Sequence, residues 1–315
     1  MTTETLHGIV ERVRLVPDRH RVFDQDTSAA MRIFRIGTPV LSDLLDLGFP
    51  SRSSGGERYF DDLDLANASL ALRLPSPRYL AMRRWPAVFR AAAVESPVRY
   101  EVEVAAECDA AEPGHRCDFR LPAEVLALGV EQASGARQFT LSREVGATGR
   151  TGEVPEELRR LFAEVSRFRF HILPPALYGD LGFMEATSLA NCELAGRYLV
   201  RRAAEDGWEA RRSFGLLLSS PYSLHHFWPE IRLDGVWTAF DPYMIISLER
   251  WGVLAPSEVP ATQVIDSAVF RVAEDWIDLV EDAGRSARVS LLTRRRQPAG
   301  DAVSGRPARP EGAES

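Results

Sequence analysis

The sequence predicts an α+β protein in which a helix that begins at a cysteine packs on an antiparallel sheet. Three observations predict this class. Apolar residues recur at helical spacing in much of the first 95 residues, and the period changes from 3.6 to 2 around Pro97. Further on, Asp234-Gly235 separates two β-rich runs, which is the strongest short-range signal for a hairpin. At 315 residues, the chain is long enough to bury a substantial core.

Residues 1–95 are expected to form a mainly helical N-terminal region. Ser76-Pro77 suits the N-cap and first position of a helix, and apolar residues follow at helical spacing as far as Phe89, with a break expected at Pro86. The other elements expected here are helices over 41–47 and 63–74 and a loop over 51–57.

Residues 96–150 are expected to form a small β-rich segment. From Arg99 to Cys108, apolar residues and glutamates alternate as in a half-buried strand. The alternation resumes after a Pro-Gly loop over 109–116, and Gln138–Val145 is a third expected strand. Gly146–Gly152 is a flexible boundary by composition.

Cysteine usage predicts a reducing compartment. The chain has three cysteines, an odd number at low density, and their spacing matches no metal-binding pattern. Cys108 and Cys117 fall on the apolar faces of adjacent expected strands, so both are expected to be packing residues. We therefore expect neither a disulfide scaffold nor a bound metal.

Composition excludes several classes of function. The chain has no lysine, which rules out a Schiff-base lysine and the Walker-A phosphate loop, and no G-x-G-x-x-G follows a strand. The sequence therefore predicts no cofactor. The net charge of −7 argues against nucleic acid as a partner, and no apolar run approaches the roughly 20 residues of a membrane span. The N-terminus lacks the pattern of a secretory signal, so a cytoplasmic location is expected.

The candidate nucleophile lies in the segment 151–292. Asn191 is a good N-cap residue, which places Cys192 in the first turn of a helix that continues with an apolar stripe and stops at Asp206-Gly207. A helix start and a nearby imidazolium both favour the thiolate form of a cysteine. A lone helical cysteine is more often a packing residue, so the assignment depends on its partners.

Hairpin geometry supplies those partners. If Asp234-Gly235 is a two-residue loop, paired residue numbers sum to 469, and His226 becomes a diagonal neighbour of Asp241 on one face. His225 then points to the opposite face. A bulge at Pro229 would shift the register by one residue and reverse this choice.

These residues resemble the transglutaminase-like superfamily. Its pattern of a helix-start cysteine, His-x-Trp-x-Glu-aliphatic, Trp and Asp-Pro is similar to Ala190–Glu193, His226–Ile231, Trp237 and Asp241-Pro242 here, in the same chain order. The resemblance covers about residues 160–245. It implies a papain-type core in which Cys192 is the nucleophile, His226 the base and later the acid, and Asp241 the residue that orients the imidazole.

The resemblance implies acyl transfer through a Cys192 thioester. Bacterial antibiotic-pathway amide synthases resemble this chain, so we expect amide-bond formation from an acyl thioester or amide substrate, either free or on a carrier protein. The alternatives are a cysteine peptidase or amidase and a catalytically inactive binding module. A cyclase is disfavoured, because Dieckmann cyclases with a similar core have the order Cys, Asp, His.

Other candidates carry weaker signals. Trp228 and Trp237 could equally wall a substrate cleft or pack within the hairpin. The backbone N–H of Cys192 at the helix start is a candidate oxyanion donor. Tyr178 is a candidate second donor, although packing is the commoner role of such a residue. His171 could line a pocket, although a core or surface position is more usual. Residues 293–315 are rich in Arg, Pro, Gly, Ala and Ser and are expected to form a disordered tail.

Overall fold

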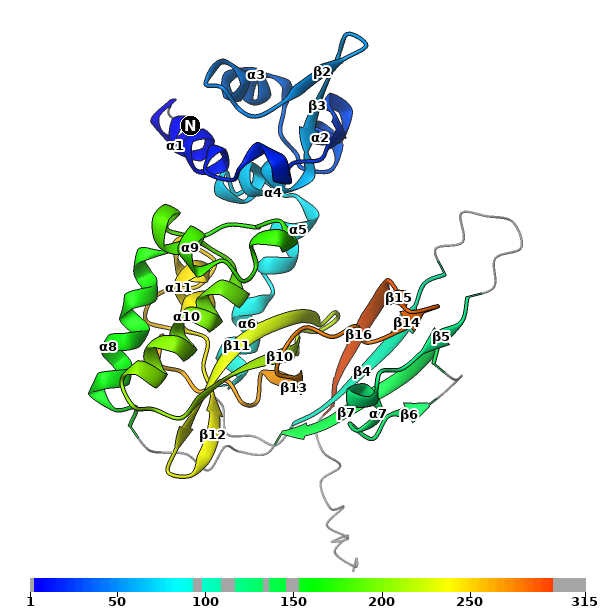
Figure 1. Cartoon of the computed structure of the whole chain (residues 1–315), viewed down its shortest axis with the longest axis vertical. Coiled ribbons are helices and arrows are strands. Elements are labelled where there is room, and N and C mark those ends of the chain that lie inside the picture. The colour runs from blue at the N-terminus through cyan, green and yellow to red at the C-terminus, as the bar shows by residue number, and fades with distance from the viewer. Residues whose placement is uncertain (1–2, 93–97, 109–116, 133–135, 146–152, 297–315) are drawn as a thin grey trace, which may run out of the picture.

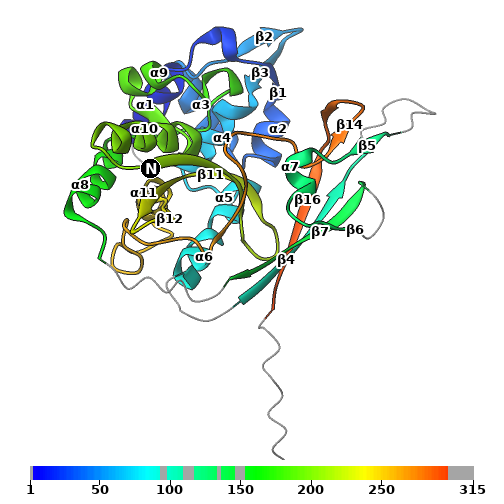
Figure 2. The same cartoon turned by 60° about the horizontal axis from the view of Figure 1, so that its bottom comes forward.

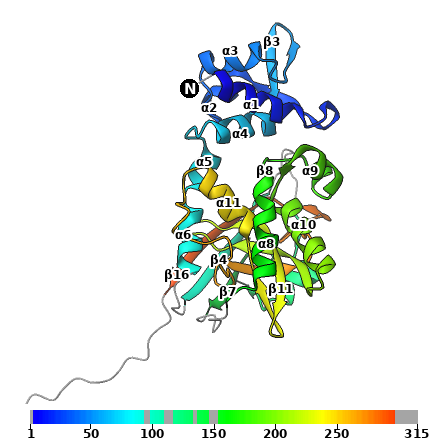
Figure 3. The same cartoon turned by 90° about the vertical axis from the view of Figure 1, so that its left-hand side faces the viewer.

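A computed structural model describes residues 3–92, 98–108, 117–132, 136–145 and 153–296, and their architecture is α+β, as predicted (Figure 1). Every sheet is antiparallel except one short parallel pair of strands. Figures 1 and 3 show an N-terminal unit above a helix-and-sheet core, and a further sheet lies beside that core in Figure 1. In the part of the chain that the structure describes, no helix combines the length and apolar character that a membrane crossing requires.

The N-terminal unit packs helices around a small sheet. Its helices are α1 (Thr3–Arg14), α2 (Thr27–Arg32), α3 (Thr38–Asp46) and α4 (Asp62–Ala71), and its sheet has the order β1 (Phe23–Asp26), β3 (Glu57–Asp61), β2 (Arg52–Ser54). Their buried apolar residues form a separate core, which includes Ile9, Phe34 and Phe60. The helices expected over 41–47 and 63–74 are present as α3 and α4.

The loop expected over 51–57 was a wrong prediction. These residues form most of a hairpin in which β2 and β3 join through Gly55-Gly56. Both glycines have positive φ, at 59° and 84°, as a two-residue hairpin turn requires. The side chains of β2 are all exposed, so no apolar alternation marked the strand.

Two further helices lead from this unit to the core. They are α5 (Pro77–Met82) and α6 (Trp85–Ala92). The Ser76 hydroxyl caps α5 by accepting from the Tyr79 N–H at 3.4 Å, as predicted, and the expected break falls between Met82 and Trp85. Phe89 of α6 is fully buried among residues of the core.

The β-rich segment forms a four-stranded sheet that is completed by a strand from much later in the chain. The order is β16 (Val289–Arg296), β4 (Val98–Ala106), β7 (Gln138–Val145), β6 (Glu131–Gln132). Burial alternates along the whole of β4, and β7 has the expected bounds. Beside this sheet lie α7 (Ala123–Leu126) and a smaller sheet of β15 (Arg285–Ser286), β14 (Glu281–Asp282) and β5 (Phe119–Arg120).

The fold extends beyond its predicted C-terminal boundary. The tail was expected to begin at residue 293, but Thr293–Arg296 belong to β16 and pair with β4. Glutamates on β4 bind two of these arginines, since Glu101 lies 2.8 Å from Arg296 and Glu103 lies 3.6 Å from Arg294. Residues 297–315 and the boundary at 146–152 lie outside the described residues.

Cys108 and Cys117 form a disulfide, so their assignment as buried packing residues was wrong. Cys108 is exposed and Cys117 half-buried, and their Cα atoms are 6.0 Å apart. The odd count concealed this pairing, because two cysteines form the bond and Cys192 is left as a free thiol. A disulfide is typical of oxidising compartments and argues against the reducing one that we expected.

This pairing predicts a thiol count. Protein purified without reductant and then denatured should react with Ellman's reagent at one thiol per chain, and at three thiols after reduction. Peptide mapping should place the single label on Cys192. Three reactive thiols before reduction would show that the Cys108–Cys117 bond is not formed.

The core joins a four-stranded sheet to a group of helices. The sheet order is β12 (Val236–Ala239), β11 (Leu224–Leu233), β10 (Ala210–Leu217), β13 (Val269–Ala273), and a short parallel pair is formed by β8 (Arg169–Phe170) and β9 (Leu189–Ala190). The helices are α8 (Glu156–Glu164), α9 (Leu181–Thr187), α10 (Cys192–Glu205) and α11 (Pro242–Arg250). Figure 2 shows α10 lying along β11. A buried apolar cluster of the helices and the sheet includes Phe162, Leu194 and Ile231.

Candidate active site

Cys192 is held at the start of α10 by contacts on both sides of it. The Asn191 side chain caps the helix, as predicted, by accepting from the Leu194 N–H at 2.9 Å. The preceding residue, Ala190, lies in β9, and its carbonyl accepts from the Tyr243 hydroxyl at 2.8 Å. The cysteine itself is partly exposed. These anchors fix the sulfur at a helix N-terminus, where the helix dipole favours negative charge.

The β11–β12 hairpin has the predicted register. Leu233 lies opposite Val236 and Glu230 opposite Ala239, so paired numbers sum to 469. The Phe240 N–H extends this register by donating to the Pro229 carbonyl at 3.1 Å. Pairing of β11 with β10 is also continuous through Pro229, so the bulge that would have reversed the choice of histidine is absent from this hairpin.

His226 and Asp241 are in direct contact. The His226 Nε2 and the Asp241 Oδ2 are 2.5 Å apart, and both residues are buried. Asp241 lies beyond the end of β12 and caps α11, with its Oδ1 accepting from the Met244 N–H at 3.0 Å. Each carboxylate oxygen therefore has its own partner, and the carboxylate cannot rotate without losing one of them.

The Cys192 side chain lies close enough to His226 to raise the pKa of the imidazole. Because Nε2 faces Asp241, Nδ1 is the ring nitrogen left for the sulfur. Burial would by itself lower the pKa of His226, but the negative charge and hydrogen bond of Asp241, together with Cys192, raise this pKa to about 10. This upward shift favours the protonated imidazole, which is the form that a thiolate–imidazolium pair requires.

His225 points away from this group, as the register predicts. Its ring lies 5.6 Å from that of Phe214 and 4.9 Å from that of Trp276, centroid to centroid. Burial lowers the pKa of His225. The two adjacent histidines thus have opposite environments, and only His226 joins the cysteine and the aspartate.

The three predicted substrate-binding residues lie in different settings. Trp228 is 1% exposed and stacks against the His226 ring with centroids 6.2 Å apart. This burial favours packing within the hairpin over a place in the wall of a substrate cleft. Trp237 is half-buried beside the Arg211 guanidinium, 4.3 Å from its ring centroid. Tyr178 is close enough to Cys192 for the sulfur, after the larger effect of burial, to raise the pKa of its hydroxyl. Of the three, Tyr178 is the residue whose pKa is raised by Cys192.

One feature near the sulfur, Tyr243, was not identified from the sequence, whereas the Cys192 N–H at the helix start was an expected oxyanion donor. Tyr243 is fully buried, and burial followed by the charge of Cys192 raises its pKa well above the ordinary value. The first-turn N–H groups of α10, at Cys192 and Glu193, have no acceptor within the helix itself and are available for an oxyanion. The Pro242 that follows Asp241 was a signal for the start of α11, and Tyr243 lies in its first turn.

No family model matches this sequence, and no curated protein matches it significantly. Among the residues with described positions, no group of three or more His, Cys, Asp and Glu side chains is arranged to hold a metal ion. The chemistry of the site therefore rests on the three side chains and their contacts.

Proposed function

We propose that this chain is a cysteine-dependent acyltransferase with a transglutaminase-like, papain-type core. The observation that carries the proposal is the hydrogen bond between the buried His226 and Asp241 beside Cys192, whose side chain is close enough to raise the pKa of the imidazole. A helix-start thiol, an imidazole between sulfur and carboxylate, and a carboxylate fixed by a second hydrogen bond are the parts that thiol catalysis needs. Tyr178 and the first-turn N–H groups of α10 are the proposed oxyanion donors.

The proposed reaction has two steps. In the first, the Cys192 thiolate attacks the acyl carbonyl carbon, the S–C bond forms, and the bond to the leaving group breaks as the His226 imidazolium protonates that group. In the second, an amine attacks the thioester carbonyl and gives its proton to the now neutral imidazole. The C–S bond breaks, and an amide and the thiolate are released. Asp241 holds the ring in one tautomer throughout.

We favour an amine over water as the second nucleophile. The support is the resemblance to amide synthases of bacterial specialised-metabolite biosynthesis. The competing activities are hydrolysis, as in a cysteine peptidase or amidase, and no turnover, as in an inactive binding module. The proposed acyl donor is a thioester or amide, free or on a carrier protein. The cytoplasmic location stays a prediction, which the disulfide argues against.

The test is trapping of the acyl-enzyme. The protein is incubated with acetyl and benzoyl thioesters of N-acetylcysteamine and its intact mass is measured. We expect the mass to rise by one acyl group, located on the peptide that contains Cys192, and to return to its first value when an amine is added, with release of the amide. Return in buffer alone, at an equal rate and without amide, would identify a hydrolase instead.

Two matched pairs of variants control this test. Cys192→Ala should form no adduct, while Cys192→Ser keeps a similar shape and should acylate at least 100-fold more slowly. His226→Ala should suppress acylation near neutral pH, and His225→Ala should not, since the two residues face opposite ways. An adduct that persists in folded Cys192→Ala would refute the proposal, and no adduct on the wild type with any donor would favour the binding module.

A further inference from the structure

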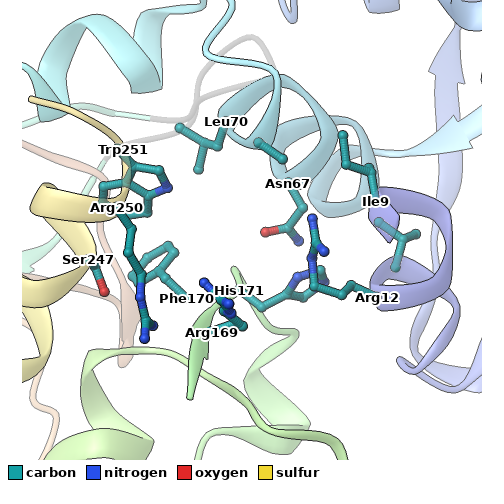
Figure 4. Close-up of a pocket in the computed structure, with 12 residues that line it drawn as sticks. Ile9, Arg12, Asn67, Leu70, Arg169, Phe170, His171, Ser247, Arg250 and Trp251 are labelled. Carbon is teal, nitrogen blue, oxygen red and sulfur yellow. The ribbon is translucent and has the colours of Figure 1, made fainter. Parts of the chain in front are cut away.

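A cavity of about 310 Å³ lies where the N-terminal unit meets the core (Figure 4). Four elements supply its wall. Arg12 comes from α1 and Asn67 from α4, Arg169 begins β8, and Arg250 ends α11. Figure 4 shows their side chains arranged around one open space. The cavity has the size at which small-molecule pockets begin, about 300 Å³.

The charge in this cavity is all of one sign. Three arginines line it, Arg12, Arg169 and Arg250, and none of the twelve lining residues is an aspartate or glutamate. Within the described ranges, no carboxylate lies within the 4.0 Å ion-pair distance of these three guanidinium groups. Burial, followed by the charge of Arg169, lowers the pKa of both Arg12 and Arg250. Arg12 and Arg250 are half-buried and Arg169 is exposed, and a bound anion would relieve the repulsion among these three like charges.

A buried histidine beside them lacks a partner. His171 is 3% exposed and lines the cavity, and its Nε2 has no hydrogen-bond partner in the part of the chain described. Burial, and then the charges of Arg12 and Arg21, lower the pKa of His171 to about 3, so its ring is neutral. Because buried polar atoms are almost always hydrogen-bonded, a buried Nε2 at the cavity wall is suited to bind a polar ligand atom.

The rest of the wall is rigid and partly aromatic. The Arg250 guanidinium donates to the Ser166 and Phe168 carbonyls, which fixes its place. The rings of Phe170 and Trp251 pack edge to face with centroids 5.0 Å apart. An aromatic wall next to three guanidinium groups suits a ligand that has both an anionic head and a planar organic part.

We propose that this cavity binds a small organic phosphate, a phosphomonoester dianion whose phosphate is held by Arg12, Arg169 and His171 and whose organic part packs on Phe170 and Trp251. Guanidinium groups bind phosphate through paired N–H donors. A phosphate charge of −2 neutralises more of the positive charge of the three arginines than a single carboxylate does. The cavity is distinct from the proposed acyl site, because its lining residues include none of Cys192, His226 and Asp241. The proposal therefore does not depend on acyltransferase activity.

Calorimetric titration with phenyl phosphate, inorganic phosphate, benzoate and phenol tests it. We expect phenyl phosphate to bind most tightly and inorganic phosphate about tenfold more weakly, since it lacks the ring. Benzoate and phenol should bind at least 100-fold more weakly. Equal affinity of benzoate and phenyl phosphate would overturn the assignment to phosphates, and no binding of phenyl phosphate at 10 mM would overturn the site.

Variants locate the binding. Arg12→Gln and Arg169→Gln should each weaken phenyl phosphate at least tenfold, whereas Arg14→Gln, on the exposed side of the same helix α1, should leave it unchanged. Trp251→Leu should remove the preference for phenyl phosphate over inorganic phosphate. Arg250 is left in place because it holds two carbonyls. Thermal melts establish that each variant is folded, and equal weakening by Arg14→Gln would refute a localised site.

Discussion

Replacement of Asp241 by asparagine is expected to lower turnover by about four orders of magnitude while the melting temperature hardly changes. The carboxylate has two separable tasks, since Oδ2 binds His226 and Oδ1 caps α11. Asparagine caps a helix as well as aspartate does. As a neutral amide, it no longer stabilises the imidazolium or fixes its tautomer. Turnover with the best trapped acyl donor and a thermal melt on the same sample measure the two effects.

Asp241→Ala is the matched control for this separation. It should lose activity to a similar extent and, in addition, about 1 kcal/mol of stability with the helix cap. Equal activity of wild type and Asp241→Asn would mean that the carboxylate does not act on His226 during catalysis. A similar loss of stability in both variants would mean that the cap needs the charge of the carboxylate.

Gly215→Ala should be the most destabilising small substitution in the sheet, at about 3 kcal/mol. A Cβ atom on Gly215 would lie 2.0 Å from the Phe270 carbonyl oxygen and 3.0 Å from the Val272 nitrogen. Both are backbone atoms of β13, at a point where the β10–β13 register shifts, so they cannot rotate aside as a side chain can. Chemical denaturation should give the change in the free energy of unfolding.

This substitution should also affect the catalytic group, because Gly215 lies opposite His226 across β10 and β11. The control is Gly196→Ala, in α10, where the nearest atom to an added Cβ is 3.9 Å away. Alanine favours the helix by about 1 kcal/mol over glycine, so this variant should be neutral or more stable. A Gly215→Ala protein of wild-type stability would mean that β13 can move away from β10 at little cost.

The candidate site was largely predictable because its determinants are local. The cap at Asn191, the Asp234-Gly235 turn and the period of two in β11 each depend on a few adjacent residues, and together they place His226 on the correct face. The position of Asp241 was less predictable. It was expected in the strand, but β12 ends at Ala239 and the aspartate reaches His226 as a helix cap.

Features that depend on distant parts of the chain could not be predicted in the same way. Pairing of β16 with β4 joins Val289 to Ala106, and no local pattern indicates which strand will take that edge. The proposed phosphate cavity likewise brings together Arg12, Arg169 and Arg250, which are far apart in the sequence. In the sequence, none of them differs from an ordinary surface arginine. The polar β2 strand escaped notice because its exposed side chains give no apolar period.

The β16–β4 pairing has a consequence for synthesis of the protein. On the ribosome, β4 emerges early, and its partner strand begins 183 residues after Ala106, at Val289. At about 5–20 residues per second, the edge of β4 stays open for roughly 10–40 s. During that time it can pair with another nascent chain, as unprotected strand edges do. Glu101 and Glu103 on β4 would then also oppose such pairing, because their negative charges on two nascent chains repel each other. The repulsion ends when the arginines of β16 pair with these glutamates.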